Sequence, residues 1–293
     1  MGGVISCFNA DRIPTWRTLD WGKKNEQLEW LKSYHLGSGD PKHLRVLLCG
    51  PSGSGKSSFI NSVASTCQNQ YTEPAEVGTG IGTFTLKYKT HRIQRDGPGG
   101  QHYPFVFNDL MGLEEERGIL LEDIKLAMKG HVREDYKFDQ EQALDDSNDS
   151  YIKKPTLNDK AHILVFVVAV DFFEVAGPKI IQKMAEVKLA ARDLGIRTMA
   201  ILTKIDEKSS PLVKKDLKYV YSSKFIKNAV ENLSQNVGFP VSCIFPLKNY
   251  HAENGLKDEV DILILSALRK IIDLGNYCEN DSNVELMTKQ PTT

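Results

Sequence analysis

The sequence predicts an α/β fold in which helices cover both faces of a doubly wound, mostly parallel sheet. Strand-like and helix-like segments alternate along most of the 293 residues, which is typical of this fold class. Residues 161–170 are nearly all apolar and rich in β-branched side chains, as a strand buried on both faces requires. A glycine-rich loop between the first strand and the next helix is a third indication, because such sheets bind ligands where their strands end.

This loop, residues 50–57, has the sequence GPSGSGKS and matches G-x-x-x-x-G-K-[ST] in full. Its glycines let successive backbone N–H groups point at phosphate oxygens, and the helix N-terminus adds a partial positive charge. Lys56 is expected to reach the β- and γ-phosphates and to stabilise charge during catalysis, and the Ser57 hydroxyl to ligate Mg²⁺. The loop predicts a P-loop NTPase whose phosphate site comprises Ser52, Gly53, Ser54, Gly55, Lys56, Ser57 and Ser58.

The remaining elements are assigned in chain order. Short apolar or alternating segments predict strands at residues 44–49, 84–93, 103–107, 161–170, 196–202 and 241–245. The turn sequence DGPGG at residues 96–100 joins the second and third strands into a β-hairpin. Helical spacing and end signals predict helices at residues 20–34, 58–66, 119–128, 178–194, 212–218, 223–236 and 260–273.

Composition is that of an ordinary globular chain, with 41% apolar and 26% charged residues. The net charge of −1 gives no bulk attraction to nucleic acid, so no nucleic-acid partner is expected. The five cysteines show no C-x-x-C spacing, which argues against zinc and for free thiols in a reducing compartment. We therefore expect a cytoplasmic protein.

The N-terminus, MGGVISC, matches the pattern M-G-x-x-x-[ST] for myristoylation of Gly2, and Cys7 could carry a second acyl chain. One myristoyl chain gives only marginal membrane binding, so stable membrane association would need both. An unmodified, flexible terminus is the alternative. Three tryptophans follow, Trp16, Trp21 and Trp30, and they indicate a helix that either packs on the main domain or binds a partner.

Two further motifs point to the kind of nucleotide. The first is D-x-x-G, formed by Asp109 and Gly112 at the end of a predicted strand. There the aspartate can hold Mg²⁺ through a water, and the glycine N–H can bond the γ-phosphate. A switch threonine should complete the metal site; Thr79 and Thr83 both precede the strand, and we favour Thr79 as the metal ligand and catalytic residue.

The second motif, TKID, follows another apolar strand and matches [NT]-K-x-D. Guanine presents two donors on one edge, and the Asp206 carboxylate can accept both, whereas adenine would leave this carboxylate unpaired. The Lys204 stem can lie over the purine. Thr203 replaces the more usual asparagine, so weaker bracing of the loop is expected. Lys248 and Asn249, after the last strand, are also expected near the base. The motifs therefore predict GTP or GDP with Mg²⁺ as the cofactors.

Five segments together resemble the interferon-induced protein 44-like family: GPSGSGKSSFINSV, PFVFNDLMGLE, ILTKIDE, IFPLKNYH and DILILSAL. The resemblance covers roughly residues 41–273 and the tryptophan-bearing lead-in. It implies a GTP-binding G domain that acts in an interferon-induced, antiviral innate response. Longer members carry an extra N-terminal TLDc domain, and the roughly 40 residues before the first strand are too few for one.

We expect three parts in the chain. Residues 1–40 form the helical lead-in with its lipid-anchor pattern, and residues 41–275 form the G domain. Within that domain, residues 137–159 are acidic and predict a partly disordered surface insertion. Residues 276–293 are expected to be a flexible tail.

Binding and hydrolysis make different demands on the site. In small GTPases a glutamine after the D-x-x-G glycine orients the attacking water, but here that position is Leu113, which cannot hydrogen-bond water. We expect slow GTP hydrolysis that is stimulated by a partner or by a homodimer formed across the nucleotide face. The alternative is a non-hydrolysing, GTP-gated scaffold. The base-reading motif disfavours a P-loop kinase.

Overall fold

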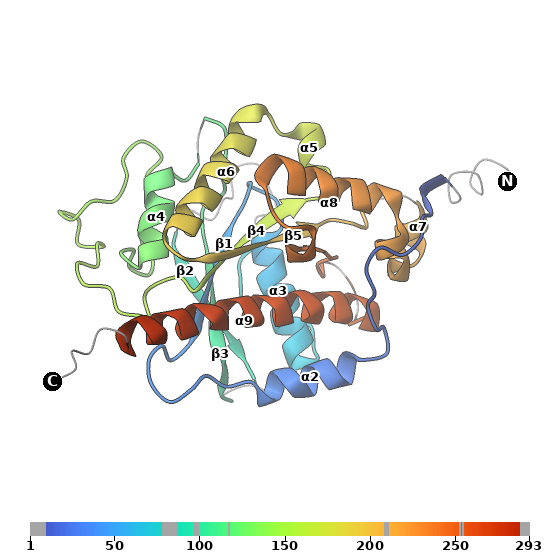
Figure 1. Ribbon diagram of the computed structural model, residues 1–293, viewed down its shortest axis with the longest axis horizontal. Coiled ribbons are helices and arrows are strands. Elements are labelled where there is room, and N and C mark those ends of the chain that lie inside the picture. Colours follow the sequence, from blue (N-terminus) through green and yellow to red (C-terminus); the bar gives the residue numbers. More distant parts are fainter. Residues whose placement is uncertain are drawn as a thin grey trace.

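The computed structural model describes residues 10–77, 87–95, 100–116, 118–207, 211–251, 253 and 255–287, with the backbone alone for 277–287. In these residues a six-stranded sheet has the strand order β2-β3-β1-β4-β5-β6 (Figure 1). The strands are β1 (Leu44–Cys49), β2 (Lys89–Gln94), β3 (His102–Asp109), β4 (Ile163–Ala169), β5 (Arg197–Thr203) and β6 (Ile244–Pro246). β2 pairs antiparallel with β3, and the other pairings are parallel. The mostly parallel sheet and the antiparallel pairing of the two hairpin strands are therefore confirmed, whereas residues 96–99 of the predicted turn lie outside the described residues.

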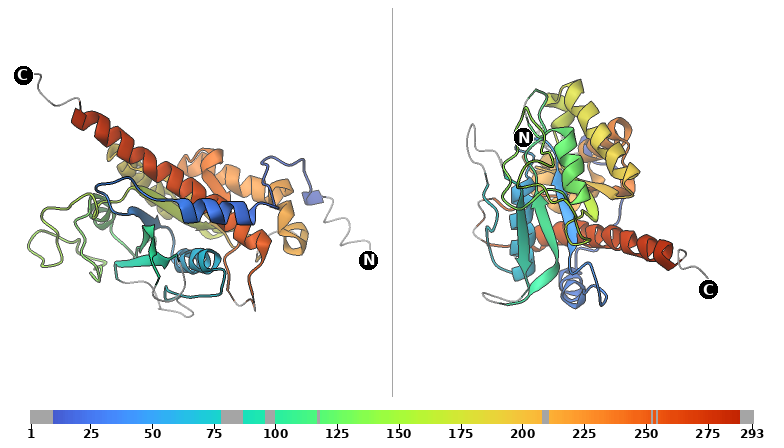
Figure 2. Two further views of the ribbon diagram at one scale, coloured as in Figure 1. Left: turned by 90° about the horizontal axis from the view of Figure 1, so that it is seen from below. Right: turned by 90° about the vertical axis from the view of Figure 1, so that its left-hand side faces the viewer.

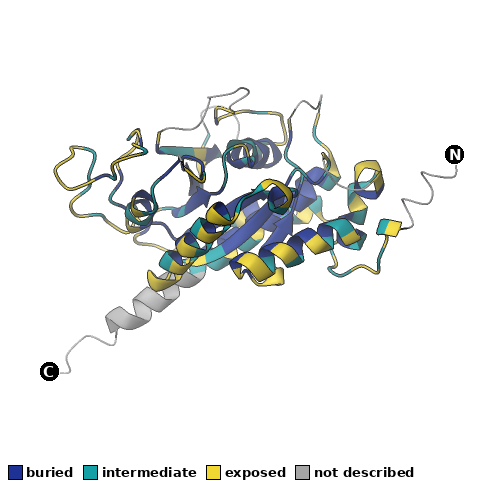
Figure 3. Ribbon diagram, turned by 90° about the horizontal axis from the view of Figure 1, so that it is seen from above, coloured by how far each residue is buried: buried dark blue, intermediate teal, exposed yellow. Residues whose placement is uncertain are grey.

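Helices cover both faces of this sheet (Figure 2). On one face lie α3 (Lys56–Gln68) and α9 (Asp258–Met287), with α2 (Lys24–Ser33) packed against α9. On the other face lie α4 (Leu121–Lys129), α6 (Pro178–Asp193) and α8 (Lys224–Val237). Shorter helices are α5 (Phe172–Val175), α7 (Pro211–Lys215) and the 3₁₀ turns Leu217–Ser222 and Val241–Cys243. Figure 3 shows the sheet buried between helices whose outer sides are exposed.

Local sequence explains why these elements form where they do. β4 is buried through residues 163–168 because its side chains are apolar on both faces of the sheet. Pro178 opens α6, where its fixed φ suits the helix and its missing N–H is not needed. The Ser223 side chain accepts the Ile226 N–H and caps α8, which ends at the left-handed Gly238.

Several predicted boundaries are wrong. α9 starts at Asp258, and the acidic residues of its first turn stabilise the helix because they lie at the positive end of its dipole. It then continues to Met287, well beyond the end predicted at residue 273. The sequence did not predict this end because the C-terminal part of the helix is polar, and a polar helix shows no apolar periodicity. The strand expected at 241–245 begins only at Ile244, after a 3₁₀ turn. Despite the length of α9, none of the helices described is apolar enough over sufficient length to cross a membrane.

The acidic insertion, residues 137–159, is irregular but partly anchored. Phe138 and Leu144 are buried, and the Asp123 carboxylate of α4 accepts the Leu144 N–H at 2.8 Å. Asp139 and Asp145 accept local backbone N–H groups and so form turns. A few apolar residues therefore hold this acidic segment against the domain, beside α4 (Figure 1).

The tryptophan-bearing lead-in packs on the domain at two places. The Arg17 guanidinium lies 4.9 Å from the Phe245 ring centroid and donates to the Ile244 carbonyl at 2.7 Å. In α2, the Trp30 ring lies under the Arg269 guanidinium of α9, 4.5 Å from ring centroid to carbon. These contacts support the packing interpretation of the tryptophans.

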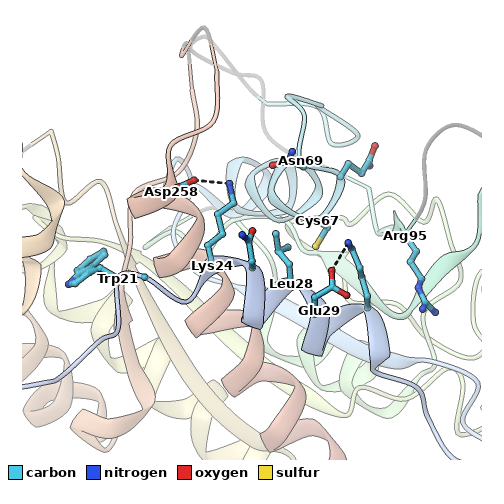
Figure 4. Close-up of a pocket in the computed structure, with 12 residues that line it drawn as sticks. Trp21, Lys24, Leu28, Glu29, Cys67, Asn69, Arg95 and Asp258 are labelled. Carbon is cyan, nitrogen blue, oxygen red and sulfur yellow. Dashed lines mark hydrogen bonds and ion pairs between the residues drawn. The ribbon is translucent and has the colours of Figure 1, made fainter.

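A groove of about 640 Å³ lies between α2 and the C-terminal end of α3 (Figure 4). Lys24 on its wall forms ion pairs with Asp258 at 2.9 Å and with Asp261 at 2.7 Å. Lys32, also on the wall, pairs with Glu29 at 3.0 Å. The charge of Lys24 is thus compensated by acids of α9 and that of Lys32 by an acid of α2 itself, and the groove lies where the lead-in helix packs on the domain.

Candidate nucleotide-binding site

The glycine-rich loop lies between β1 and α3, at the edge of the sheet where the parallel strands end (Figure 1). At Gly50 the φ angle is 152°, and a Cβ atom would lie only 2.0 Å from the Val167 carbonyl oxygen. Only glycine fits so close to a neighbouring strand. The loop then enters α3 through Gly55, which offers no capping side chain. The first N–H groups of α3 can therefore serve an anion.

Lys56 lies inside this loop rather than on the surface. Its side chain is buried, and Nζ donates to the carbonyl oxygens of Gly50 and Pro51, each at 3.0 Å. Burial lowers the pKa of Lys56, and the nearby Asp109 charge opposes that shift. The loop thus holds an ammonium group at its centre by hydrogen bonds to its own backbone.

Ser57 and Asp109 meet at the predicted metal position. The Ser57 hydroxyl donates to Asp109 Oδ2 at 2.6 Å, and Asp109 is 1% exposed at the end of β3. One hydroxyl and one carboxylate fit Mg²⁺, which takes few protein oxygens and completes its shell with phosphate and water. The described residues contain no cluster of three or more His, Cys, Asp or Glu that could hold a metal by themselves.

The D-x-x-G segment packs directly on the glycine-rich loop. The Leu113 N–H donates to the Gly50 carbonyl at 3.0 Å, and the Ser52 hydroxyl donates to Glu114 Oε1 at 2.7 Å. A Cβ atom on Gly112 would lie 2.1 Å from Ser52 Oγ and 2.7 Å from its backbone nitrogen. Leu113 is fully buried, so its side chain is directed away from any water in the site.

Gly112→Ala should therefore force the two loops apart. We expect overpacking to lower stability by about 2 kcal/mol and the Tm by roughly 4–8 °C, measured by scanning calorimetry. Gly37→Ala is the matched control, because a Cβ atom there meets nothing within 4 Å. An unchanged Tm for Gly112→Ala would contradict the close packing of the segment on the loop.

Thr203, which stands where asparagine is more usual, contacts the glycine-rich loop. Its hydroxyl is fully buried and lies 2.6 Å from the Ser54 carbonyl oxygen, to which it donates. Asn249 provides a second brace, because its Nδ2 donates to the Gly55 carbonyl at 3.1 Å. A shorter side chain suffices because the end of β5 runs close to the loop. The structure therefore places Asn249 against the loop backbone.

Thr203→Val removes the hydroxyl while keeping the side-chain shape. We expect a loss of about 1–2 kcal/mol of stability, read as a lower urea midpoint, together with weaker GTP binding. Thr203→Ser keeps the hydroxyl and should retain most of both. If the valine variant matched the wild type in both measurements, the hydroxyl would not be a brace.

The base-reading segment presents its carboxylate beside a lysine. Lys204 adopts a left-handed φ of 58°, which turns the chain sharply after β5. Asp206 Oδ2 then lies 2.9 Å from Lys248 Nζ, and this same nitrogen lies 2.8 Å from Glu253 Oε1. Lys248 thus contacts Asp206, the residue predicted to recognise the base.

The structure brings most of the predicted site together at one edge of the sheet. The phosphate loop, Asp109, Gly112, Thr203 and Asp206 all follow strands β1, β3 or β5. Thr79, its alternative Thr83, and the acylation candidates Gly2 and Cys7 lie outside the described residues.

Sequence reasoning missed Glu114 and Glu253 as site residues. Their spacing in the sequence matches no motif. Each is identified as a site residue only by its contact in the structure, Glu114 with Ser52 and Glu253 with Lys248.

The strand order and the glycine-rich loop between β1 and α3 define the fold of a P-loop G domain, in which Thr203 at the end of β5 is hydrogen-bonded to this loop. No family model matches the chain. It is 33% identical over 246 residues to human interferon-induced protein 44, which covers 84% of this chain and 55% of the relative. It is 32% identical to human interferon-induced protein 44-like, over 85% and 55% of the two chains. Across the aligned region the chain is similar to both of these interferon-induced proteins, which supports the resemblance to their family, and it spans about half the length of the curated relatives it matches.

Solved structures give more distant likenesses. A dimerization-deficient mutant of Toc33 from Arabidopsis thaliana is 17% identical with a TM-score of 0.49, over 92% of this chain and 95% of that one. A probable GTP-binding protein engB is 13% identical with a TM-score of 0.42, over 80% and 99% of the two chains. The strand order of this chain, rather than these likenesses, defines its fold class.

Proposed function

We propose that this protein binds GTP with Mg²⁺ and hydrolyses it slowly, at a rate raised by self-association or by a partner. One observation carries the proposal: the hydrogen bond from Thr203 to Ser54 joins the phosphate loop to the base-reading segment. A single nucleotide can therefore contact both. Glycine-rich loops occur in many phosphate sites, but this pairing with a carboxylate for guanine is specific to GTP.

Each part of the nucleotide has a matching group. Lys56 and the backbone N–H groups of the loop would neutralise the phosphates. Ser57 and Asp109 would hold Mg²⁺, which supplies positive charge to the β- and γ-phosphate oxygens. Asp206 would accept the two guanine donors.

Hydrolysis is expected to be slow because the apolar side chain of Leu113 cannot orient the attacking water. Glu114 lies beside the phosphate loop, but its carboxylate is bound to Ser52 and would repel a γ-phosphate. Groups from a second copy, in a homodimer across the nucleotide face, would supply what is missing.

A second candidate is a GTP-gated scaffold that does not hydrolyse. The hydrogen bonds between the D-x-x-G segment and the glycine-rich loop favour this scaffold, because Leu113 and Glu114 would have to shift when a γ-phosphate binds. Binding alone would then switch the surface around Leu113.

The names of the relatives suggest that expression is induced by interferon, and we include in the proposal a role in an innate antiviral response. We include in the proposal a cytoplasmic location and membrane association through acylation of Gly2 and Cys7. Mass spectrometry of the N-terminus tests the acylation, since each acyl chain adds a defined mass.

Single-turnover hydrolysis of GTP with Mg²⁺, over a range of protein concentrations, separates the two candidates. A rate that rises with concentration supports hydrolysis assisted by a second copy. GTP binding without phosphate release supports the scaffold. A protein that binds neither GTP nor GDP would overturn both.

A further inference from the structure

Three charged side chains meet beside the base-reading segment. Lys248 Nζ contacts both Asp206 and Glu253, at 2.9 and 2.8 Å. The side chains of Lys248 and Glu253 are only 20% and 15% exposed. The second oxygen of Glu253 accepts the His251 N–H at 2.7 Å, which fixes the direction of its carboxylate. Lys248 therefore lies between two acids in a site largely removed from water.

This arrangement conflicts with guanine recognition unless Lys248 can move. A carboxylate that accepts two guanine donors uses both of its oxygens, and Lys248 lies on one of them. If Glu253 were absent, an ammonium that left Asp206 would be a largely buried cation without an acidic partner, which is costly. Burial disfavours the charged form of Lys248, but its hydrogen bonds to Glu253 and Asp206 outweigh burial and raise its pKa. The lysine thus stays charged and needs an acid in either position.

We propose that Glu253 is a positioning residue that sets guanine specificity: it retains the Lys248 ammonium when the base displaces it from Asp206. This inference rests on the proposed GTP binding. Glu253 acts through Lys248, so it contributes to the binding of the guanine base and not to the binding of the phosphates. Without Glu253, Lys248 would remain on Asp206 and compete with guanine.

Glu253→Gln tests this, because glutamine keeps the size and an acceptor for the His251 N–H but removes the charge. We expect the Kd for GTP to rise by about tenfold, the loss of one hydrogen bond to a charged group. The Kd for inorganic tripolyphosphate, which reports the phosphate loop alone, should not change. Glu259→Gln removes the same charge from a surface pair with Lys218 and should leave both constants unchanged.

A double-mutant cycle with Lys248→Met completes the experiment. In that background Glu253→Gln should have no further effect on the Kd for GTP, because no ammonium remains to be retained. An equal loss in both backgrounds, an equal loss for tripolyphosphate, or a change below twofold in the wild-type background would overturn the inference. Failure of the wild type to bind GTP would instead overturn the proposed function, so the two failures are distinguishable.

Discussion

Lys56→Ala should weaken GTP binding by about 100-fold or more, since two charge-assisted contacts to phosphate contribute roughly 3 kcal/mol. The loop already holds the ammonium by the Gly50 and Pro51 carbonyls, so a triphosphate meets a positioned charge. The measurement is a fluorescence titration of the purified chain with a labelled GTP analogue and Mg²⁺.

Two controls make the Lys56 result interpretable. Lys227→Ala removes a lysine from an exposed pair on α8 and should leave GTP affinity unchanged. Thermal unfolding of Lys56→Ala shows whether the loop still folds once the lysine that ties its carbonyls is gone. A folded Lys56→Ala variant with wild-type affinity would mean that phosphates do not bind at this loop.

Asp206→Asn should reverse the preference for the base. An asparagine offers one acceptor and one donor, so one guanine donor would face an N–H group, and GTP affinity should fall by about 100-fold. Xanthine carries a carbonyl where guanine carries its amino group, and it therefore matches asparagine. The variant should gain affinity for XTP as it loses GTP, measured by competition against a labelled nucleotide.

The matched control is Asp193→Asn, which removes the same charge from an exposed pair at the end of α6. It should alter neither GTP nor XTP binding. If Asp206→Asn weakened both nucleotides equally, the residue would support the fold of the loop rather than recognise the base.

The phosphate loop and the base-reading segment could be predicted because their chemistry is local. Gly50 must be glycine where the loop passes Val167, and a lysine and serine must follow at fixed spacing. TKID likewise stands directly after an apolar strand, so its position at the edge of the sheet follows from the strand itself. The parallel sheet was predictable for a similar reason, since β4 is apolar on both faces.

Contacts between distant segments could not be predicted. The hydrogen bond from Thr203 to Ser54 depends on how close the end of β5 lies to the glycine-rich loop, and only the structure gives that distance. The pairs of Glu114 with Ser52 and of Glu253 with Lys248 join residues whose spacing matches no motif. The end of α9 was missed because a polar helix leaves no apolar pattern.

Calorimetric titration of the full chain with GTP and with ATP, each with Mg²⁺, tests the central claim most directly. The Asp206 carboxylate is half-buried. Because guanine satisfies it and adenine leaves it unpaired, we predict GTP binding at least about 100-fold tighter than ATP binding. Equal affinities for the two nucleotides would contradict the assignment of Asp206 to the base, and with it the account of this protein as a GTP-binding one.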